Sequence, residues 1–355
     1  MKIHNFSAGP SILPQSVFKQ AAAAVLDFNN SGLSILEISH RSKDFVSVME
    51  QAQNLALELL GLNGKGYTAL FLQGGASLQF VMVAQNLLNI KAGYINTGTW
   101  SNNAIKEARF FGEMVEVASS KNQNYNYIPK NIKIPSDIDY LHLTTNNTIF
   151  GTQFKEFPNS TVPVVCDMSS DIFSRDIDYS KFDLIYAGAQ KNMGPAGTTL
   201  VVIKDAILGK VNRPIPNILN YKLHIEKESM YNTPAVFAVF VSMLTLKWIK
   251  ENGGIVAIEK ENNKKASHLY SEIDRNPLFK GFVEHPEDRS VMNATFNLLD
   301  ESHKETFDAL LKQAGISGLN GHRSVGGYRA SMYNALPFES VKVLVDVMQE
   351  LENKI

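Results

Sequence analysis

The chain has little cysteine, little net charge and no long apolar run. Its 355 residues include a single cysteine, which excludes an internal disulfide. Lysine and arginine number 34 against 35 aspartates and glutamates, which leaves a net charge of −1. Such an even balance argues against nucleic-acid or membrane-surface binding, because both need a basic surface. No uncharged apolar stretch reaches the roughly 18 residues that a membrane helix requires.

The amino terminus and the cysteine bear on the cellular location. The segment Met1–Phe6 lacks the apolar core of a secretory signal peptide. Cys166 lies inside an apolar run, where we expect a buried and inert thiol. These features predict a soluble, cytoplasmic protein without nucleic-acid or membrane partners.

Apolar residues are plentiful enough for two domains. They make up 44% of the chain, including 20 phenylalanines and 12 tyrosines, which argues against disorder. A chain of 355 residues exceeds the size at which one core usually stops growing. We predict a large domain over residues 16–255. A smaller α+β domain would take residues 256–355 together with residues 1–15.

Strand and helix patterns alternate along the first two thirds of the chain. Predicted strands are Tyr67–Leu72, Gly93–Asn96, Glu113–Ala118, Tyr140–Thr144, Val162–Cys166, Leu184–Tyr186, Thr199–Ile203 and, further on, Val291–Leu298. Predicted helices are Ser16–Phe28, Phe45–Leu60, Leu78–Leu88, Ala235–Glu251, a helix from Ile255, Glu301–Ala314 and Phe338–Leu351. This order predicts an α/β fold with a mixed, mainly parallel sheet covered by helices on both faces.

A lysine between small residues is the most informative feature. Lys191 lies in Ala187–Asn192, directly after the apolar segment Leu184–Tyr186. A crowded ammonium loses its proton readily, and the free amine can bond a carbonyl as a Schiff base. Asp167 ends another apolar run. Pyridoxal 5'-phosphate requires this pair, a lysine for its aldehyde and an acid for its ring nitrogen. Taken singly, a turn lysine and a helix-capping aspartate would be the more ordinary interpretation.

Three further positions suit such a cofactor. The segment Gln73–Ser77 joins a predicted strand to a predicted helix, an arrangement that offers backbone N–H groups to a phosphate. Trp100, in a polar turn, could stack on a planar ring. Thr148 follows a predicted strand and could donate to the ring oxygen. Each of these signals is weak alone, because turns commonly contain such residues.

Histidine stands next to arginine in two Gly- and Ser-rich segments. His40 precedes Arg41, and His322 precedes Arg323, with Arg329 following in the same segment. Arginine binds carboxylates and phosphates through two parallel hydrogen bonds. The set therefore predicts a substrate with two anionic groups.

Together these segments resemble the phosphoserine aminotransferases, a family of fold-type I pyridoxal-phosphate enzymes, over essentially the whole chain. The matching segments are Asn5–Pro10, Ile38–Arg41, Phe71–Ser77, Ala187–Asn192, Tyr231–Pro234 and Gly321–Ser331. The lysine segment and the last segment are highly specific, whereas the Gly-Gly loop is not. The resemblance implies a fold-type I architecture and one pyridoxal phosphate per subunit of a homodimer, and no metal site is expected.

The resemblance implies a role for each candidate residue. Lys191 would hold the cofactor and move the substrate proton, and Asp167 would pair with the ring nitrogen. Trp100 would stack on the ring, and Thr148 would contact its oxygen. The cofactor phosphate would be bound by Ala76, Ser77 and Gln190, and by Asn232 and Thr233 of the other subunit. Arg329 would bind the substrate α-carboxylate, and the distal anion would be bound by His40 and Arg41 together with His322 and Arg323 of the partner subunit.

The implied reaction converts glutamate and 3-phosphohydroxypyruvate into 2-oxoglutarate and O-phospho-L-serine, a step of serine biosynthesis. It is a ping-pong reaction in which the cofactor alternates between its pyridoxal and pyridoxamine forms. Whether 4-phosphohydroxy-L-threonine, on the way to pyridoxine, is also a substrate stays open. Two departures from the family pattern, at Ala235-Val236 and at Tyr328, affect no residue with an implied role.

Other functions remain as alternatives. The same fold could transaminate a small substrate such as glyoxylate, or desulfurate cysteine with Cys166 as the nucleophile. A catalytically silent scaffold would be indicated by loss of Lys191 or Asp167, and both are present. A nucleotide-binding module is supported only by Gly74-Gly75.

Overall fold

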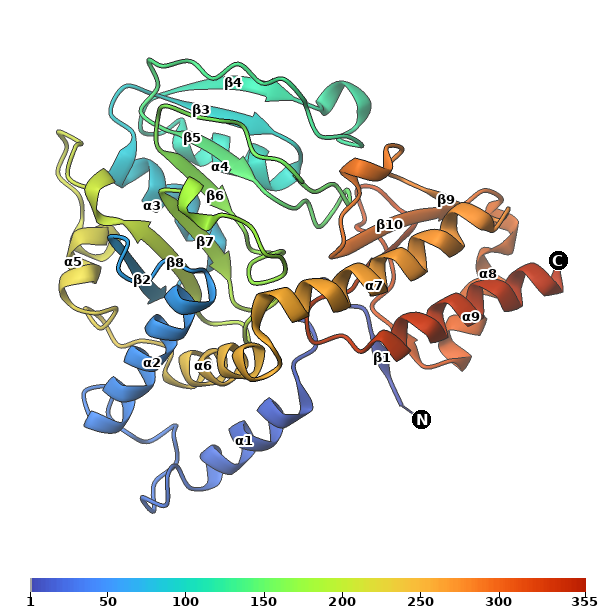
Figure 1. Ribbon diagram of the computed structural model, residues 1–355, viewed down its shortest axis with the longest axis horizontal. Coiled ribbons are helices and arrows are strands. Elements are labelled where there is room, and N and C mark those ends of the chain that lie inside the picture. The colour runs from blue at the N-terminus through green and yellow to red at the C-terminus, as the bar shows by residue number, and fades with distance from the viewer. Residues whose placement is uncertain (1) are drawn as a thin grey trace.

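The computed structural model describes residues 2–355, and its centre is a seven-stranded sheet with helices on both sides (Figure 1). The strand order is β2-β8-β7-β6-β5-β3-β4. The strands are β2 (Tyr67–Leu72), β3 (Lys91–Asn96), β4 (Glu113–Ser119), β5 (Leu141–Thr144), β6 (Val164–Asp167), β7 (Leu184–Gly188) and β8 (Thr199–Lys204). The neighbours from β4 to β7 are parallel, whereas β8 is antiparallel to β7 and β2. The predicted mixed, mainly parallel sheet is confirmed.

Helices cover both faces of this sheet because its strands are apolar on both faces. In β6, Val165 packs into a core with Phe80 of α3, whereas the next residue, Cys166, packs into a core with Val239 of α6. The surrounding helices are α1 (Gln15–Leu26), α2 (Lys43–Leu59), α3 (Gly75–Leu87), α4 (Thr99–Ala108), α5 (Tyr221–Glu226) and α6 (Val236–Glu251). Cys166 is buried, as predicted, and burial raises the pKa of its thiol.

The carboxyl ends of the parallel strands place several polar residues at one edge. β5 ends at Thr144, β6 at Asp167 and β7 at Gly188. The loop after β5 is buried throughout residues 145–151. In open α/β sheets, ligands bind outside the carboxyl ends of the strands, so this edge is where a site is expected.

A second, smaller sheet lies beside the first (Figure 1). It is antiparallel in the order β12-β10-β9, and a separate short parallel pair joins β1 to β11. The elements are β1 (His4–Asn5), β9 (Phe279–Gly281), β10 (Asn293–Leu298), β11 (Ile316–Ser317), β12 (Tyr328–Ser331), α7 (Gly254–Arg275), α8 (Lys304–Gln313) and α9 (Phe338–Lys354). Its own apolar core includes Phe6 from the amino-terminal segment. Figure 1 shows α7 running from α6 to this unit.

Several element boundaries differ from the prediction. The helix expected from Leu78 begins at Gly75, because Gly74 adopts the left-handed conformation (φ 93°) that starts it one turn earlier. Trp100 lies near the start of helix α4 rather than in the loop that was expected. The expected helix Glu301–Ala314 is divided into a 3-10 turn and α8. Short 3-10 turns also occur at Lys121–Gln123, Tyr179–Lys181, Asp205–Ile207, Asn217–Leu219 and Pro286–Asp288. Over residues 2–355, none of the helices combines the length and apolar character needed to cross a membrane.

Candidate active site

A cavity of about 380 Å³ opens at the carboxyl ends of the central strands. It is bounded by the amino-terminal segment, the start of α3, the loops after β5 and β7, and β12 of the smaller sheet. The lining residues are Ala8, Gly9, Gly75, Ala76, Ser77, Phe80, Trp100, Thr148, Ile149, Asp167, Ser169, Gln190, Lys191, His322 and Arg329. The structure thus brings together nine of the predicted site residues: Ala76, Ser77, Trp100, Thr148, Asp167, Gln190, Lys191, His322 and Arg329.

Lys191 lies in the turn after β7, and hydrogen bonds to the backbone of this turn hold it in place. Ser11 fixes this turn, because its N–H donates to Gln190 O (3.0 Å) and its hydroxyl to Lys191 O (2.5 Å). The Lys191 Nζ atom lies 5.7 Å from the centre of the Trp100 ring. Burial lowers the pKa of the Lys191 ammonium, and the nearby charge of Arg329 lowers it further, while Asp167 opposes the shift. The site therefore favours a free amine, which is the reactive form toward a carbonyl.

Asp167 faces the cavity from the end of β6 and is 4% exposed. Its Oδ1 accepts a hydrogen bond from Ser169 N at 3.0 Å. Burial raises the pKa of the Asp167 carboxyl, whereas the charge of Lys191 and the bond from Ser169 lower it. A buried carboxylate of this kind is stabilised by a second cation, such as a protonated ring nitrogen.

The start of α3 offers unpaired N–H groups to an anion. The first hydrogen bond of this turn runs from Leu78 N to Gly74 O, so the N–H groups of Gly75, Ala76 and Ser77 precede it. These groups carry the positive end of the helix dipole, an arrangement that binds phosphate. Ser77 is exposed toward this end of the cavity.

Arg329 and His322 reach the cavity from the smaller unit. Arg329 lies in β12, and its Nη1 donates to Thr148 O at 3.4 Å. Burial lowers the pKa of the Arg329 guanidinium. His322 Nδ1 bonds to Ser324 Oγ at 2.6 Å. The pKa of His322 is lowered by burial and by the charges of Arg329 and Arg323, so an anionic ligand would be needed to protonate it near neutral pH.

The remaining predicted residues do not line this cavity. His40 and Arg41 lie in the loop before α2, where His40 Nε2 is buried without a partner among residues 2–355. Asn232, Thr233 and Arg323 are exposed. His322 of the same chain lines the cavity, whereas the resemblance assigned it to the partner subunit. The binding roles of these six residues stay predictions.

The comparisons with known proteins agree with this geometry. The model of the aminotransferase class-V family matches residues 3–344. The phosphoserine aminotransferase of Flavobacterium johnsoniae is 70% identical, and the match covers 100% of both chains. A solved phosphoserine aminotransferase from Bacillus circulans subsp. alkalophilus superimposes with a TM-score of 0.96 at 43% identity and 99% coverage of each chain. The chain belongs to the phosphoserine aminotransferases of aminotransferase class V.

A pyridoxal-phosphate enzyme with a solved structure is also among the relatives. The phosphoserine aminotransferase of Trichomonas vaginalis, described as bound to the cofactor, has a TM-score of 0.92 and 35% identity over 98% of this chain and 100% of its own. Members of this family are fold-type I enzymes, and pyridoxal phosphate is the cofactor of the chain.

The residues present fit this cofactor. Within residues 2–355, Trp100 Nε1, Thr148 Oγ1 and Arg329 Nε are buried without hydrogen-bond partners. A buried polar atom without a partner is costly, so three of them around one cavity indicate a polar ligand. Gly9 lies beside the Lys191 side chain, where an added Cβ would lie 3.4 Å from Lys191 Cγ and leave less room for a bound ring.

Sequence reasoning assigned no role to Ala8, Gly9, Ile149 or Ser169, which also line the cavity. Only the first two had a signal, because the segment Asn5–Pro10 matches the family. Ile149 and Ser169 are ordinary residues that the fold places next to Thr148 and Asp167, so no local pattern distinguishes them.

Proposed function

We propose that this cavity carries out the phosphoserine aminotransferase reaction. Glutamate and 3-phosphohydroxypyruvate exchange an amino group to give 2-oxoglutarate and O-phospho-L-serine. The observation that carries the proposal is the meeting of Lys191, Asp167 and Arg329 in one cavity. These residues supply an amine, a buried carboxylate and a carboxylate-binding cation, which are the groups that amino-acid transamination needs.

The residues of this cavity have separable roles in the reaction. Pyridoxal phosphate supplies an electron sink for negative charge at the substrate Cα. Lys191, whose burial favours the free amine, would take the proton from Cα and pass it to the cofactor carbon that carried the aldehyde. Asp167 keeps a proton on the ring nitrogen through its negative charge. The N–H groups of Ala76 and Ser77 hold the cofactor phosphate, assisted by Gln190, and Trp100 stacks on the ring.

Cationic side chains bind the two anionic groups of the substrate. Arg329 binds the α-carboxylate at the base of the cavity. His322, with His40, Arg41 and Arg323, binds the distal anion, which is a phosphate in phosphoserine and a carboxylate in glutamate. Serine lacks this second anion and would leave these cations without their partner, so it is rejected.

The active enzyme is a homodimer whose subunits share each site. Asn232 and Thr233 are exposed and lie outside the cavity of their own chain, which supports their contact with the cofactor phosphate of the partner. The neighbouring Tyr231 (37% exposed) and Ile218 (47% exposed) leave apolar surface that a second subunit would cover.

Two other assignments belong to the same proposal. The division at residue 255, with the first 15 residues in the smaller domain, is supported by the separate core that contains Phe6. A cytoplasmic location is supported by the buried free thiol of Cys166. That burial also argues against cysteine desulfuration, which needs an accessible thiolate.

Acceptor specificity tests the proposal. The rate of 2-oxoglutarate formation from glutamate is measured with 3-phosphohydroxypyruvate and with 3-hydroxypyruvate, which differ only in the phosphate. We expect kcat/KM to fall by at least about 10⁴-fold without the phosphate, the range for sites that leave polar groups unpaired. Equal kcat/KM values would show that the distal anion is not recognised.

A further inference from the structure

We propose that Asn293 is a positioning residue that fixes Arg329 relative to the loop that contains Thr148. Arg329 lies in β12 of the smaller sheet, whereas Thr148 lies in the loop after β5 of the central sheet. The reaction requires the substrate carboxylate and the cofactor ring to keep one distance. The inference rests on the proposed function, because it takes Arg329 as the carboxylate ligand.

Asn293 is fully buried in β10 and uses both ends of its amide. Its Oδ1 accepts from Asn146 Nδ2 at 2.7 Å. Its Nδ2 donates to Ser331 Oγ at 3.0 Å and to Tyr333 Oη at 3.4 Å. In the β10–β12 pair, Asn293 stands opposite Ser331, and the neighbouring position on the same side pairs Thr295 with Arg329. One amide therefore joins the strand of Arg329 to a residue of the loop that follows β5 of the central sheet.

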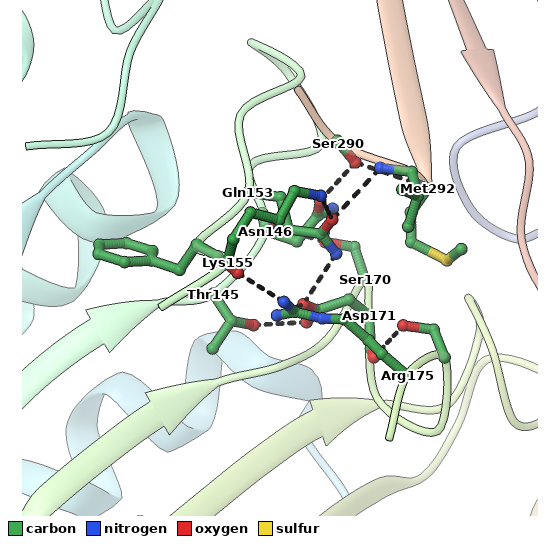
Figure 2. Close-up of polar contacts among 12 residues, drawn as sticks. Thr145, Asn146, Gln153, Lys155, Ser170, Asp171, Arg175, Ser290 and Met292 are labelled. Atoms are coloured by element: carbon green, nitrogen blue, oxygen red, sulfur yellow. Dashed lines mark hydrogen bonds and ion pairs between the residues drawn. The ribbon is translucent and has the colours of Figure 1, made fainter. Parts of the chain in front are cut away.

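Asn146, at the other end of this bond, lies on the side of the cavity that the carboxyl ends of the central strands form. It lies in the loop after β5, the loop that ends in Thr148 and Ile149 at the cavity. Asn146 Nδ2 also donates to Ser170 Oγ at 2.8 Å, and Ser170 Oγ donates back to Asn146 O at 2.8 Å. Asn146 Oδ1 accepts from Ser290 Oγ at 2.5 Å. Figure 2 shows Asn146 between Ser170, in the loop after Asp167, and Ser290, which precedes β10.

The contact that Arg329 itself makes with this loop is weaker than the amide bond, while Thr295, its partner on β10, donates to Phe150 O of the loop at 2.9 Å. Arg329 Nη1 reaches Thr148 O at 3.4 Å, at the long end for a hydrogen bond. The bond from Asn146 to Asn293 is 2.7 Å long and buried. A short buried bond between fully satisfied amides resists displacement, because any shift leaves a polar group unpaired. A misplacement of about 1 Å in a reacting geometry can cost roughly 100-fold in rate.

Asn276 offers a matched control. It is 2% exposed, and its Nδ2 donates to Glu272 Oε1 (2.9 Å) and Met348 O (3.2 Å) at the end of α7. None of these residues lines the cavity. Asn276→Ala and Asn293→Ala therefore remove equally buried amides, but only Asn293→Ala cuts the link to the site.

The experiment compares full-length, cofactor-loaded wild type with Asn293→Ala and Asn276→Ala. Thermal unfolding gives the stability of each, and calorimetry gives the Kd of glutarate, a dicarboxylate that cannot react. We expect similar losses of stability in both variants. Only Asn293→Ala should weaken glutarate binding, by at least about tenfold, and raise the KM for glutamate, because only its arginine is displaced. An equal Kd in the two variants would overturn the proposal.

A second variant keeps the test decisive if Asn293→Ala does not fold. Asn146→Ala removes the same bond from the other side, and its Kd for glutarate should rise comparably; an unchanged Kd would again overturn the inference. If both fold, the double variant should bind glutarate no more weakly than the worse single one, since the bond between Asn146 and Asn293 is already lost in each. Failure of the proposed function looks different, because wild type itself would then transfer no amino group to 3-phosphohydroxypyruvate.

Discussion

Lys191 and Asp167 lie in the same cavity, and the charge of each favours the charged form of the other. Burial lowers the pKa of the lysine and raises that of the aspartate, while the charge of each shifts the other back. Arg329 adds to the lowering at Lys191. Because its pKa is lowered, the Lys191 amine stays unprotonated down to a lower pH than an ordinary lysine, so it can serve as a base near neutrality. This capacity is lost as the pH falls through the lowered pKa.

Replacement of Lys191 tests its role. Lys191→Ala should lower kcat for glutamate by at least about 100-fold, the low end of what a general acid–base group contributes. The visible absorbance of the bound cofactor should also change, because the covalent partner of its aldehyde is gone. Lys155→Ala is the control, since burial lowers the pKa of Lys155 to about 8 although it does not line the cavity. Ordinary turnover by Lys191→Ala would refute the assignment.

The candidate residues differ in how far the sequence could predict them. Lys191 and Asp167 were predictable because each follows an apolar strand, so its place at the strand end is local. Trp100 lines the cavity, and its stacking on the ring stays a prediction, but its expected place in a turn was wrong because α4 begins directly after Gly98. The positions of His40 and Arg41 depend on the course of the loop before α2, which no local pattern encodes.

At the scale of elements, α7 holds the segment after β12 through a buried lysine. Lys265 is 1% exposed, and its Nζ donates to Met332 O at 3.0 Å and Tyr333 O at 2.8 Å. Burial lowers the pKa of Lys265 to about 7. Between this value and the ordinary value of about 10.4, the unfolded chain binds one more proton than the folded one, so this lysine makes the free energy of unfolding rise with pH.

The variant Lys265→Met should remove this dependence. Urea unfolding of cofactor-loaded protein is measured across the same pH range for both proteins. The stability difference, wild type minus variant, should grow by up to about 1.4 kcal/mol per pH unit between the two pKa values and be flat below the lower one. A difference that does not vary with pH would show that Lys265 keeps its ordinary pKa.

A buried ion pair fixes the loop after β6. Arg175 Nη2 and Asp171 Oδ2 are 2.8 Å apart, and Thr145 donates a further hydrogen bond to Asp171 (Figure 2). Arg175→Met should cost about 3–5 kcal/mol in urea unfolding, because it leaves the Asp171 carboxylate buried without a cation. Lys250→Met, in an exposed pair with Glu58, should change stability by no more than about 1 kcal/mol. Similar losses in the two variants would contradict the burial argument.

Long elements with a clear period were predictable, and short ones were not. Most of the strands from β2 to β8 are rich in buried apolar residues, so their existence and mainly parallel order followed from the alternation with helices. β9 has three residues and β1 and β11 have two each, too few to show any period. Their pairing is long-range, as when His4 pairs with Ile316, and it follows from tertiary packing.

At the scale of the whole molecule, subunit mixing tests the shared sites. One variant carries Lys191→Ala, and the other carries Asn232→Ala with Thr233→Ala. If these two residues serve the partner's cofactor, a mixed dimer contains one site without any substitution, and activity returns on mixing. If they serve their own chain, every site in the mixed dimer is damaged and mixing restores nothing. Size-exclusion chromatography of each variant alone checks that dimers form.

We propose that this chain exchanges amino groups with a phosphorylated amino acid through Lys191 and its cofactor. The most direct test adds O-phosphoserine, and separately serine at the same concentration, to purified cofactor-loaded protein while its visible absorbance is followed. We expect phosphoserine to convert the visible band to that of the pyridoxamine form, and serine to leave the band unchanged. A band that responds equally to both, or to neither, would contradict the proposal.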